Sequence, residues 1–168
     1  MPLFLSPLEA FLHWEKEIPN HPFLLQPING QLIKYSYKEA GIEIRKVAIK
    51  LQSLGLAEKS HIALLSKNCA HWMMSDLAIM MAGFVSIPIY TSLTAKSIHQ
   101  VLTHSESKAI IIGKLDDYSS IKEGITAIPK IGIELYGIKE EYSWENIIQS
   151  EGSDITIKFP KLSDTHTI

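Results

Sequence analysis

The sequence has almost no cysteine, almost no arginine and no long apolar run, and each scarcity excludes a class of protein. Cys69 is the single cysteine, so the chain cannot form an internal disulfide, which favours a reducing compartment and a cytoplasmic location. Arg45 is the single arginine and the formal net charge is −2, which argues against nucleic acid as a partner. Apolar residues make up 46% of the chain, enough for a globular core.

Signals for insertion into a membrane or export across it are also missing. The longest apolar run covers residues 77–85, roughly half of the ~20 residues that a spanning helix needs. The N-terminal stretch MPLFLSPLEAF has no basic residue before its apolar ones, so no secretory signal is expected. We therefore expect no transmembrane segment, and leave peripheral contact with a membrane open.

The familiar catalytic motifs do not occur. No Gly-x-Gly or Gly-Lys-Ser loop is present to hold a phosphate, and no serine lies in a Gly-x-Ser-x-Gly turn. His99 and His104 are five residues apart on one expected helix and so lie on different faces, whereas a zinc pair needs a spacing of about four. We therefore expect no catalytic, cofactor-binding or metal-binding residue in this chain.

Residues 1–36 are predicted to form a helix and a β-hairpin. Ser6-Pro7-Leu8-Glu9 is typical of a helix start, with a capping hydroxyl and proline at the first helical position. Two extended segments follow, Phe23–Ile28 and Gln31–Tyr35. Asn29-Gly30 between them is the pair that most readily adopts the two positive φ angles of a tight hairpin turn.

Residues 37–160 alternate between helical and strand patterns with short connections. A capping box, Ser36 with Glu39, predicts a helix that ends at Gly55. The alternation predicts an α/β fold: a mostly parallel sheet with right-handed crossovers and helices on both faces. The expected order continues with strand 61–66, helix 70–83, strand 85–90, helix Ala95–His104, strand Ala109–Gly113, helix Ser119–Thr126, strand Ile131–Leu135, helix Trp144–Gln149 and a further strand Ile155–Phe159.

Ligands of open parallel sheets bind beyond the carboxyl ends of the strands, so the loops there are the places to search. In the first loop, SKNCAHW, Asn68 is interpreted as the cap of the next helix. In the second, YTSLTAKS, a capping role for Thr94 is favoured over ligand contact. In the third, GKLDDYSS, a turn at Asp116-Asp117 is favoured over a metal site.

Cysteine and tryptophan are interpreted as packing residues. Cys69 is expected to be a small buried apolar side chain. All three tryptophans fall on expected helices, where core packing is favoured over stacking on a ligand: Trp14, Trp72 and Trp144.

Four stretches occur in the same order as the motifs of a known enzyme family. YSYKEA at 35–40 matches a Tyr-Thr-Tyr-x-Glu-Leu segment that opens a helix. The stretch from Gly55 to Tyr90 matches Gly-Leu, Val-Ala-Ile-Leu-Ser-x-Asn, Glu-Trp and Val-Pro-Leu-Tyr, and SIHQVLTHSESKAIIIGKLDDY matches the next helix, turn and strand. LSDTHTI matches the approach to a phosphate-binding loop. The chain thus resembles AMP-forming acyl-CoA synthetases of the long-chain fatty acid type, with departures at His61 and Ala70-His71 in the scaffold.

The resemblance implies that residues 1–168 are an incomplete part of the large N-terminal, AMP-binding domain of such a ligase. The complete enzyme would convert a fatty acid and ATP, with magnesium, into acyl-adenylate and pyrophosphate, and coenzyme A would then displace AMP. In the family pattern the phosphate-binding groups follow Ile168. This chain alone is therefore expected to be inactive and to bind no cofactor.

Two other interpretations stay open. The chain could be a stand-alone interaction or regulatory module derived from the same fold. It could also be a small flavodoxin-like nucleotide-binding protein, although its loops lack a phosphate cradle. The nearly all-apolar helix expected at 70–83 further predicts that the chain exposes an apolar face and self-associates. Acyl chain length, and the choice between coenzyme A and a carrier protein as acceptor, are left open.

Overall fold

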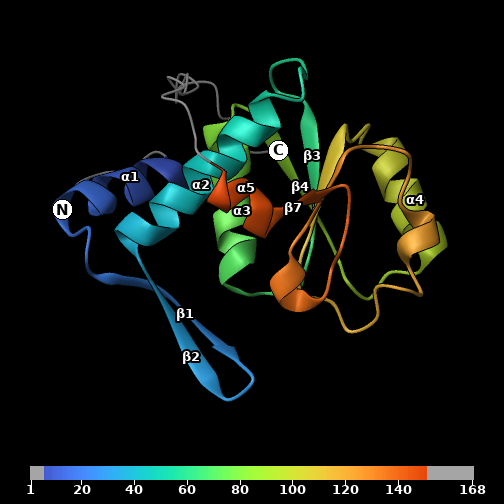
Figure 1. Ribbon diagram of the computed structural model, residues 1–168. Coiled ribbons are helices and arrows are strands. Elements are labelled where there is room, and N and C mark those ends of the chain that lie inside the picture. Colours follow the sequence, from blue (N-terminus) through green and yellow to red (C-terminus); the bar gives the residue numbers. More distant parts are fainter. Residues whose placement is uncertain (1–5, 151–168) are drawn as a thin grey trace.

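The computed structural model describes residues 6–150 and shows an α/β body from which a β-hairpin projects (Figure 1). The expected strand Ile155–Phe159 and the LSDTHTI segment lie outside these residues. Helix α1 (Pro7–Glu17) begins as predicted: the Glu9 N–H donates a hydrogen bond to Ser6 Oγ at 3.2 Å.

The hairpin consists of β1 (Pro22–Ile28) and β2 (Gln31–Ser36), paired antiparallel. At its turn, Asn29 and Gly30 have φ angles of 49° and 78°. These are the two positive angles that a two-residue hairpin turn requires. The predicted hairpin is confirmed.

Helix α2 (Tyr37–Gln52) starts with the expected capping box. The Glu39 N–H donates to Ser36 Oγ at 3.2 Å, and the Ser36 N–H donates to the Glu39 carboxylate at 2.9 Å. The helix packs beside α3 (Ala70–Met81), whose inward residues are fully buried. Tertiary packing of this kind supplies most of the stability of such helices.

Within the described residues, five strands form one parallel sheet in the order β4-β3-β5-β6-β7. Side chains of β3 alternate between two clusters: Ile62 and Leu64 pack on one face, Ala63 and Leu65 on the other. Burial on both faces explains why the strands read as continuous apolar segments. The strands are β3 (His61–Leu65), β4 (Val85–Ile89), β5 (Ala109–Ile112), β6 (Lys130–Gly132) and β7 (Tyr142–Ser143).

Helices cover both faces of this sheet, as predicted (Figure 1). Helices α2, α3 and α5 (Trp144–Gln149) lie on one side, and α4 (Ala95–His104) lies on the other. The Ser97 N–H donates to Thr94 Oγ1 at 3.3 Å, so Thr94 caps α4 as expected. Most elements of the α/β fold are therefore those that the alternation of patterns predicts, whereas the short strand β7 was not predicted.

Two predicted elements are wrong. The expected helix Ser119–Thr126 is only a 3-10 turn, η1 (Lys122–Gly124), because the backbone becomes extended at Ile125 and a helix cannot continue through it. The expected strand Ile131–Leu135 is too long. It ends at Gly132, and a 3-10 turn, η2 (Glu134–Tyr136), follows.

The early end of this strand is explained by a side chain about ten residues further along the chain. The carboxylate of Glu145 accepts hydrogen bonds from the Glu134 N–H at 3.0 Å and the Leu135 N–H at 2.9 Å. Those two donors would otherwise serve the sheet, so Glu145 holds the backbone in the turn.

Three packing interpretations also need correction. Asn68 does not cap α3: Cys69 occupies the cap position and makes no side-chain cap bond. Cys69 itself is only half-buried. Trp14 keeps 37% of its surface exposed, whereas Trp144 is fully buried and Trp72 packs at the edge of the core.

Candidate functional site

The carboxyl end of the sheet has one topological switch point, between β3 and β5, where open α/β sheets usually bind ligands. Here direct hydrogen bonds join the segments that follow the two strands. The Lys114 N–H donates to Ser66 Oγ at 2.9 Å, and the Lys67 N–H donates to the Lys114 carbonyl at 2.8 Å. Gly113 makes this approach possible, since a Cβ would lie 2.6 Å from Ser66 Oγ.

The loops after β4 and β5 line a cavity of about 380 Å³ at the same edge. The two acidic side chains that the sequence analysis considered there both make contacts within the protein. Asp117 accepts hydrogen bonds from Ser119 Oγ at 2.6 Å and the Ser120 N–H at 3.3 Å, which is the predicted turn. These bonds lower the pKa of Asp117. Asp116 forms an ion pair with Lys67.

Metal ligands do not converge in the described part of the chain. No group of three or more histidine, cysteine or acidic side chains lies close enough there to hold an ion. His99 and His104 are both exposed on α4. Among residues 6–150, no helix is long and apolar enough to cross a membrane.

His71 lies in a buried cluster of aromatic rings near the start of α3. Its Nδ1 is 3.1 Å from the Tyr136 hydroxyl oxygen. The rings of Tyr35, Tyr136 and Trp144 surround it, with centroids 5.8, 5.4 and 5.3 Å away. Burial lowers the pKa of His71 to about 4, so the imidazole is neutral at pH 7. A neutral ring enclosed by aromatic side chains serves packing better than acid–base chemistry.

The same cluster reaches a half-buried carboxyl group on α2. Trp144 Nε1 donates a hydrogen bond to Glu43 Oε2 at 2.8 Å. Burial raises the pKa of Glu43 more than this bond lowers it. Glu43 and Trp144 thus tie α2 to α5 in the core.

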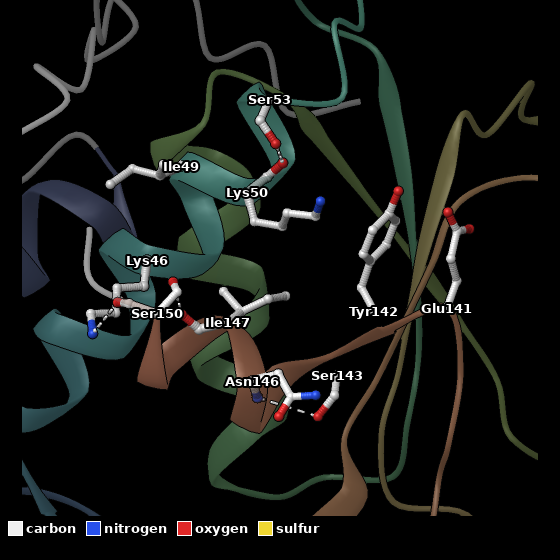
Figure 2. Close-up of a pocket in the computed structure, with 10 residues that line it drawn as sticks. All are labelled: Lys46, Ile49, Lys50, Ser53, Glu141, Tyr142, Ser143, Asn146, Ile147 and Ser150. Carbon is white, nitrogen blue, oxygen red and sulfur yellow. Dashed lines mark hydrogen bonds between the residues drawn. The ribbon is translucent and has the colours of Figure 1, made fainter. Parts of the chain in front are cut away.

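A groove of about 360 Å³ runs between α2 and the β7–α5 segment (Figure 2). On the α2 side it is lined by residues spaced three or four apart, which places them on one helical face. Lys50 Nζ lies 3.6 Å from the centroid of the Tyr142 ring across the groove. The other lining residues are Lys46, Ile49, Ser53, Glu141, Ser143, Asn146, Ile147 and Ser150.

Sequence reasoning identified the strand-end loops but missed both the groove and the His71 cluster. Their residues come from segments that are far apart: Lys50 and Tyr142, or His71 and Trp144. The one available signal was the i, i+4 spacing of Lys46 and Lys50 on α2.

Comparison with known proteins identifies a matching family and several similar proteins. A family model described as "AMP-binding enzyme" matches residues 11–161. The long-chain-fatty-acid–[acyl-carrier-protein] ligase AEE15, chloroplastic, of Arabidopsis thaliana is 28% identical over 156 residues, which are 86% of this chain and 21% of that protein. The long-chain-fatty-acid–CoA ligase heimdall of Drosophila melanogaster is 26% identical over 59% of this chain and 15% of its own length.

Solved structures show the same fold. The coronafacic acid ligase of Pectobacterium brasiliense superposes with a TM-score of 0.71 at 23% identity, covering 85% of this chain and 29% of that one. The N-terminal subdomain of NpsA from Klebsiella oxytoca gives a TM-score of 0.60 at 18% identity, covering 90% of this chain and 35% of its own. The chain thus spans about a fifth of the length of the first relative and about a third of these solved chains or less.

Proposed function

This chain belongs to the AMP-binding enzyme family, and from that premise we propose that it forms the first part of the large N-terminal domain of a long-chain fatty acid–thiol ligase. The family match over residues 11–161 is the observation that supports the proposal most strongly. Relatives whose names state fatty acid ligase activity support the substrate class. The division into residues 1–36 and 37–160 is part of the same proposal.

The proposed reaction joins a fatty acid to coenzyme A in two steps. ATP and the fatty acid form an acyl-adenylate and release pyrophosphate, and the thiol then displaces AMP. By their names, the Drosophila relative uses coenzyme A and the Arabidopsis relative uses acyl carrier protein. We take coenzyme A as the acceptor, with a carrier protein as the alternative. The single, half-buried free cysteine favours a cytoplasmic location.

The described residues do not fit an ATP–magnesium site. At the switch point, the Lys114 N–H and Ser66 Oγ are bonded to each other and are not free to bind a phosphate. The carboxylates nearest to it are already engaged, Asp116 by Lys67 and Asp117 by its own turn. We therefore assign no step of the reaction to these residues. Their proposed role is to supply the sheet and helices that support the enzyme, so the 168 residues alone should be inactive.

Calorimetric titration tests this scaffold role. Mg–ATP, a long-chain fatty acid and coenzyme A are titrated separately into the 168-residue chain. No saturable binding of Mg–ATP is expected, because no loop among residues 6–150 offers a phosphate cradle. Saturable Mg–ATP binding would contradict the scaffold role.

A stand-alone interaction module is the second candidate, and exposed leucines favour it. Leu25 and Leu32 are 55% and 50% exposed. The strand register places both on one face of the hairpin, since Leu25 pairs with Lys34 and Leu32 with Pro27. Most of α3, by contrast, is covered by its neighbours. Self-association of this chain is therefore proposed to run through the hairpin rather than through α3.

A further inference from the structure

The groove between α2 and the β7–α5 segment combines cationic and apolar side chains (Figure 2). The contacts that stabilise the fold do not account for this combination. Its apolar lining is the Tyr142 ring of β7, Ile49 of α2 and the 9% exposed Ile147 of α5, and polar side chains make up the rest. A volume of about 360 Å³ is in the range of small-molecule sites and too small for a folded partner.

The two lysines of the groove differ in how they are used. Lys46 Nζ donates to the backbone carbonyls of Ile148, at 2.5 Å, and Ser150, at 3.1 Å, so it closes the end of α5. Lys50 extends from α2 toward Tyr142 and rests on the aromatic face (Figure 2). Within residues 6–150, the ion pairs involve other lysines and arginine but not Lys50.

Two serine hydroxyls of the groove are already engaged. Ser53 Oγ donates to the Lys50 carbonyl at 2.7 Å, and Ser150 Oγ donates to the Ile147 carbonyl at 2.7 Å. The neighbouring Glu141 carboxylate raises the pKa of the Tyr142 hydroxyl at the rim. Lys50 is left as the group in this groove that can accept a new charged partner.

An ammonium group on an aromatic face keeps its other side free for an anion. A carboxylate or phosphate that approaches from the groove gains a charge-assisted hydrogen bond without separating Lys50 from Tyr142. The isoleucine walls then favour a ligand whose anionic head is attached to an apolar body. A cationic ligand is excluded by the same lysine.

We propose that this groove binds a small amphiphilic anion, with its carboxylate or phosphate head on Lys50 and a short apolar body between Ile49 and Ile147. The site is separate from the switch point between β3 and β5, since its residues come from α2, α5 and the segment around β7. Its failure would leave the proposed function untouched.

Titration calorimetry with three probes tests the proposal. Octanoate and octyl phosphate, both kept below their micelle concentrations, carry head and body, whereas inorganic phosphate carries the head alone. At least one amphiphile should bind saturably, and the preferred one identifies the head group. Inorganic phosphate should bind more weakly. Absence of saturable binding by both amphiphiles, or equal affinity for inorganic phosphate, would overturn the proposal.

Variants of exposed or half-buried positions locate the binding site. Lys50→Gln should weaken the preferred amphiphile about tenfold, the cost of losing one charge-assisted bond. Ile49→Ser should weaken the amphiphile but leave inorganic phosphate unchanged. Lys38→Gln, in the first turn of the same helix and outside the groove, is the matched control and should bind as the unaltered chain does. Equal affinities of the Lys50 and Lys38 variants would overturn the assignment.

Discussion

Gln26 of the hairpin caps helix α3: its Oε1 accepts a hydrogen bond from the Ala70 N–H at 2.8 Å. Gln26 is 5% exposed, and its Nε2 donates to the Pro27 carbonyl at 3.0 Å. The residue before the helix, Cys69, makes no capping bond of its own. A side chain 44 positions away thus satisfies a buried helix N-terminus and fastens the hairpin to the α/β body.

Replacing Gln26 should therefore destabilise the fold. Gln26→Met keeps the size of the side chain but removes the carbonyl oxygen, which leaves the buried Ala70 N–H unpaired. We expect the free energy of unfolding to fall by about 1–3 kcal/mol. Urea unfolding measures it, with Gln31→Met on exposed β2 as the control. Equal stability of the two variants would show that the cap contributes nothing.

The effect of Gly41→Ala on stability should depend on whether Glu15 is present. An alanine Cβ at this position would lie 1.8 Å from Glu15 Oε1, which accepts a hydrogen bond from Arg45 at 2.6 Å. Gly41→Ala should thus disturb the Glu15–Arg45 pair and give no gain in stability. In a Glu15→Ala background the same change should stabilise by about 0.5–1 kcal/mol, the usual helix preference for alanine over glycine.

A double-mutant cycle tests whether Gly41 and Glu15 conflict, with the free energy of unfolding measured in urea. The four chains are the unaltered one, Gly41→Ala, Glu15→Ala and the double variant. A gain from Gly41→Ala that is equal in both backgrounds would contradict the proposed conflict between Gly41 and Glu15.

His71 should make stability depend on pH in the acid range. Its pKa is about 4 in the folded chain, against an ordinary value of 6.5. Between these values the unfolded chain binds more protons than the folded one, so the free energy of unfolding falls as pH drops from about 6.5 to 4. The contribution is fully present above pH 6.5 and amounts to at most about 3 kcal/mol.

The His71→Gln variant isolates this contribution, because its side chain does not titrate. Urea midpoints are compared at a series of pH values from 4 to 8, and the difference between the two chains should change only in the acid part. Carboxyl groups with raised pKa, Glu43 and Asp76, titrate in both chains and cancel in the comparison. Parallel pH profiles would mean that His71 does not titrate as described.

The hairpin leucines should control self-association. Leu25→Lys combined with Leu32→Lys places charge on the exposed face and should shift the 168-residue chain toward the monomer. Met73→Lys, at a 43% exposed position on α3, is the matched control and should change little. Sedimentation velocity at several concentrations measures the result. A chain that is monomeric throughout, or a larger effect from Met73, contradicts association through the hairpin.

Sequence patterns predicted the fold well where the structure of a short segment depends only on its own residues. Ser6, Ser36 and Thr94 cap their helices as expected, and Asn29-Gly30 makes the turn. Each of these features depends on residues within three or four positions, so it can be inferred from spacing alone.

Predictions failed where contacts with residues distant in the sequence determine the local structure. The strand after Lys130 stops early because the Glu145 carboxylate takes two backbone donors, and α3 is capped by Gln26 rather than Asn68. The groove at Lys50 likewise depends on Tyr142, which lies far away in the sequence. Such contacts follow from the packing of whole elements, and no periodicity of the sequence encodes them.

The most direct test of the central claim is fatty-acid-dependent release of pyrophosphate from ATP. The natural gene is first read beyond the codon for Ile168, and the protein that it encodes is assayed beside the 168-residue chain. We predict that the gene continues into a glycine- and hydroxyl-rich phosphate-binding loop. We also predict that the complete protein releases pyrophosphate with a long-chain fatty acid and that the 168 residues release none. A gene that ends at Ile168, or a complete protein with no such activity, would contradict the ligase assignment and favour the interaction module.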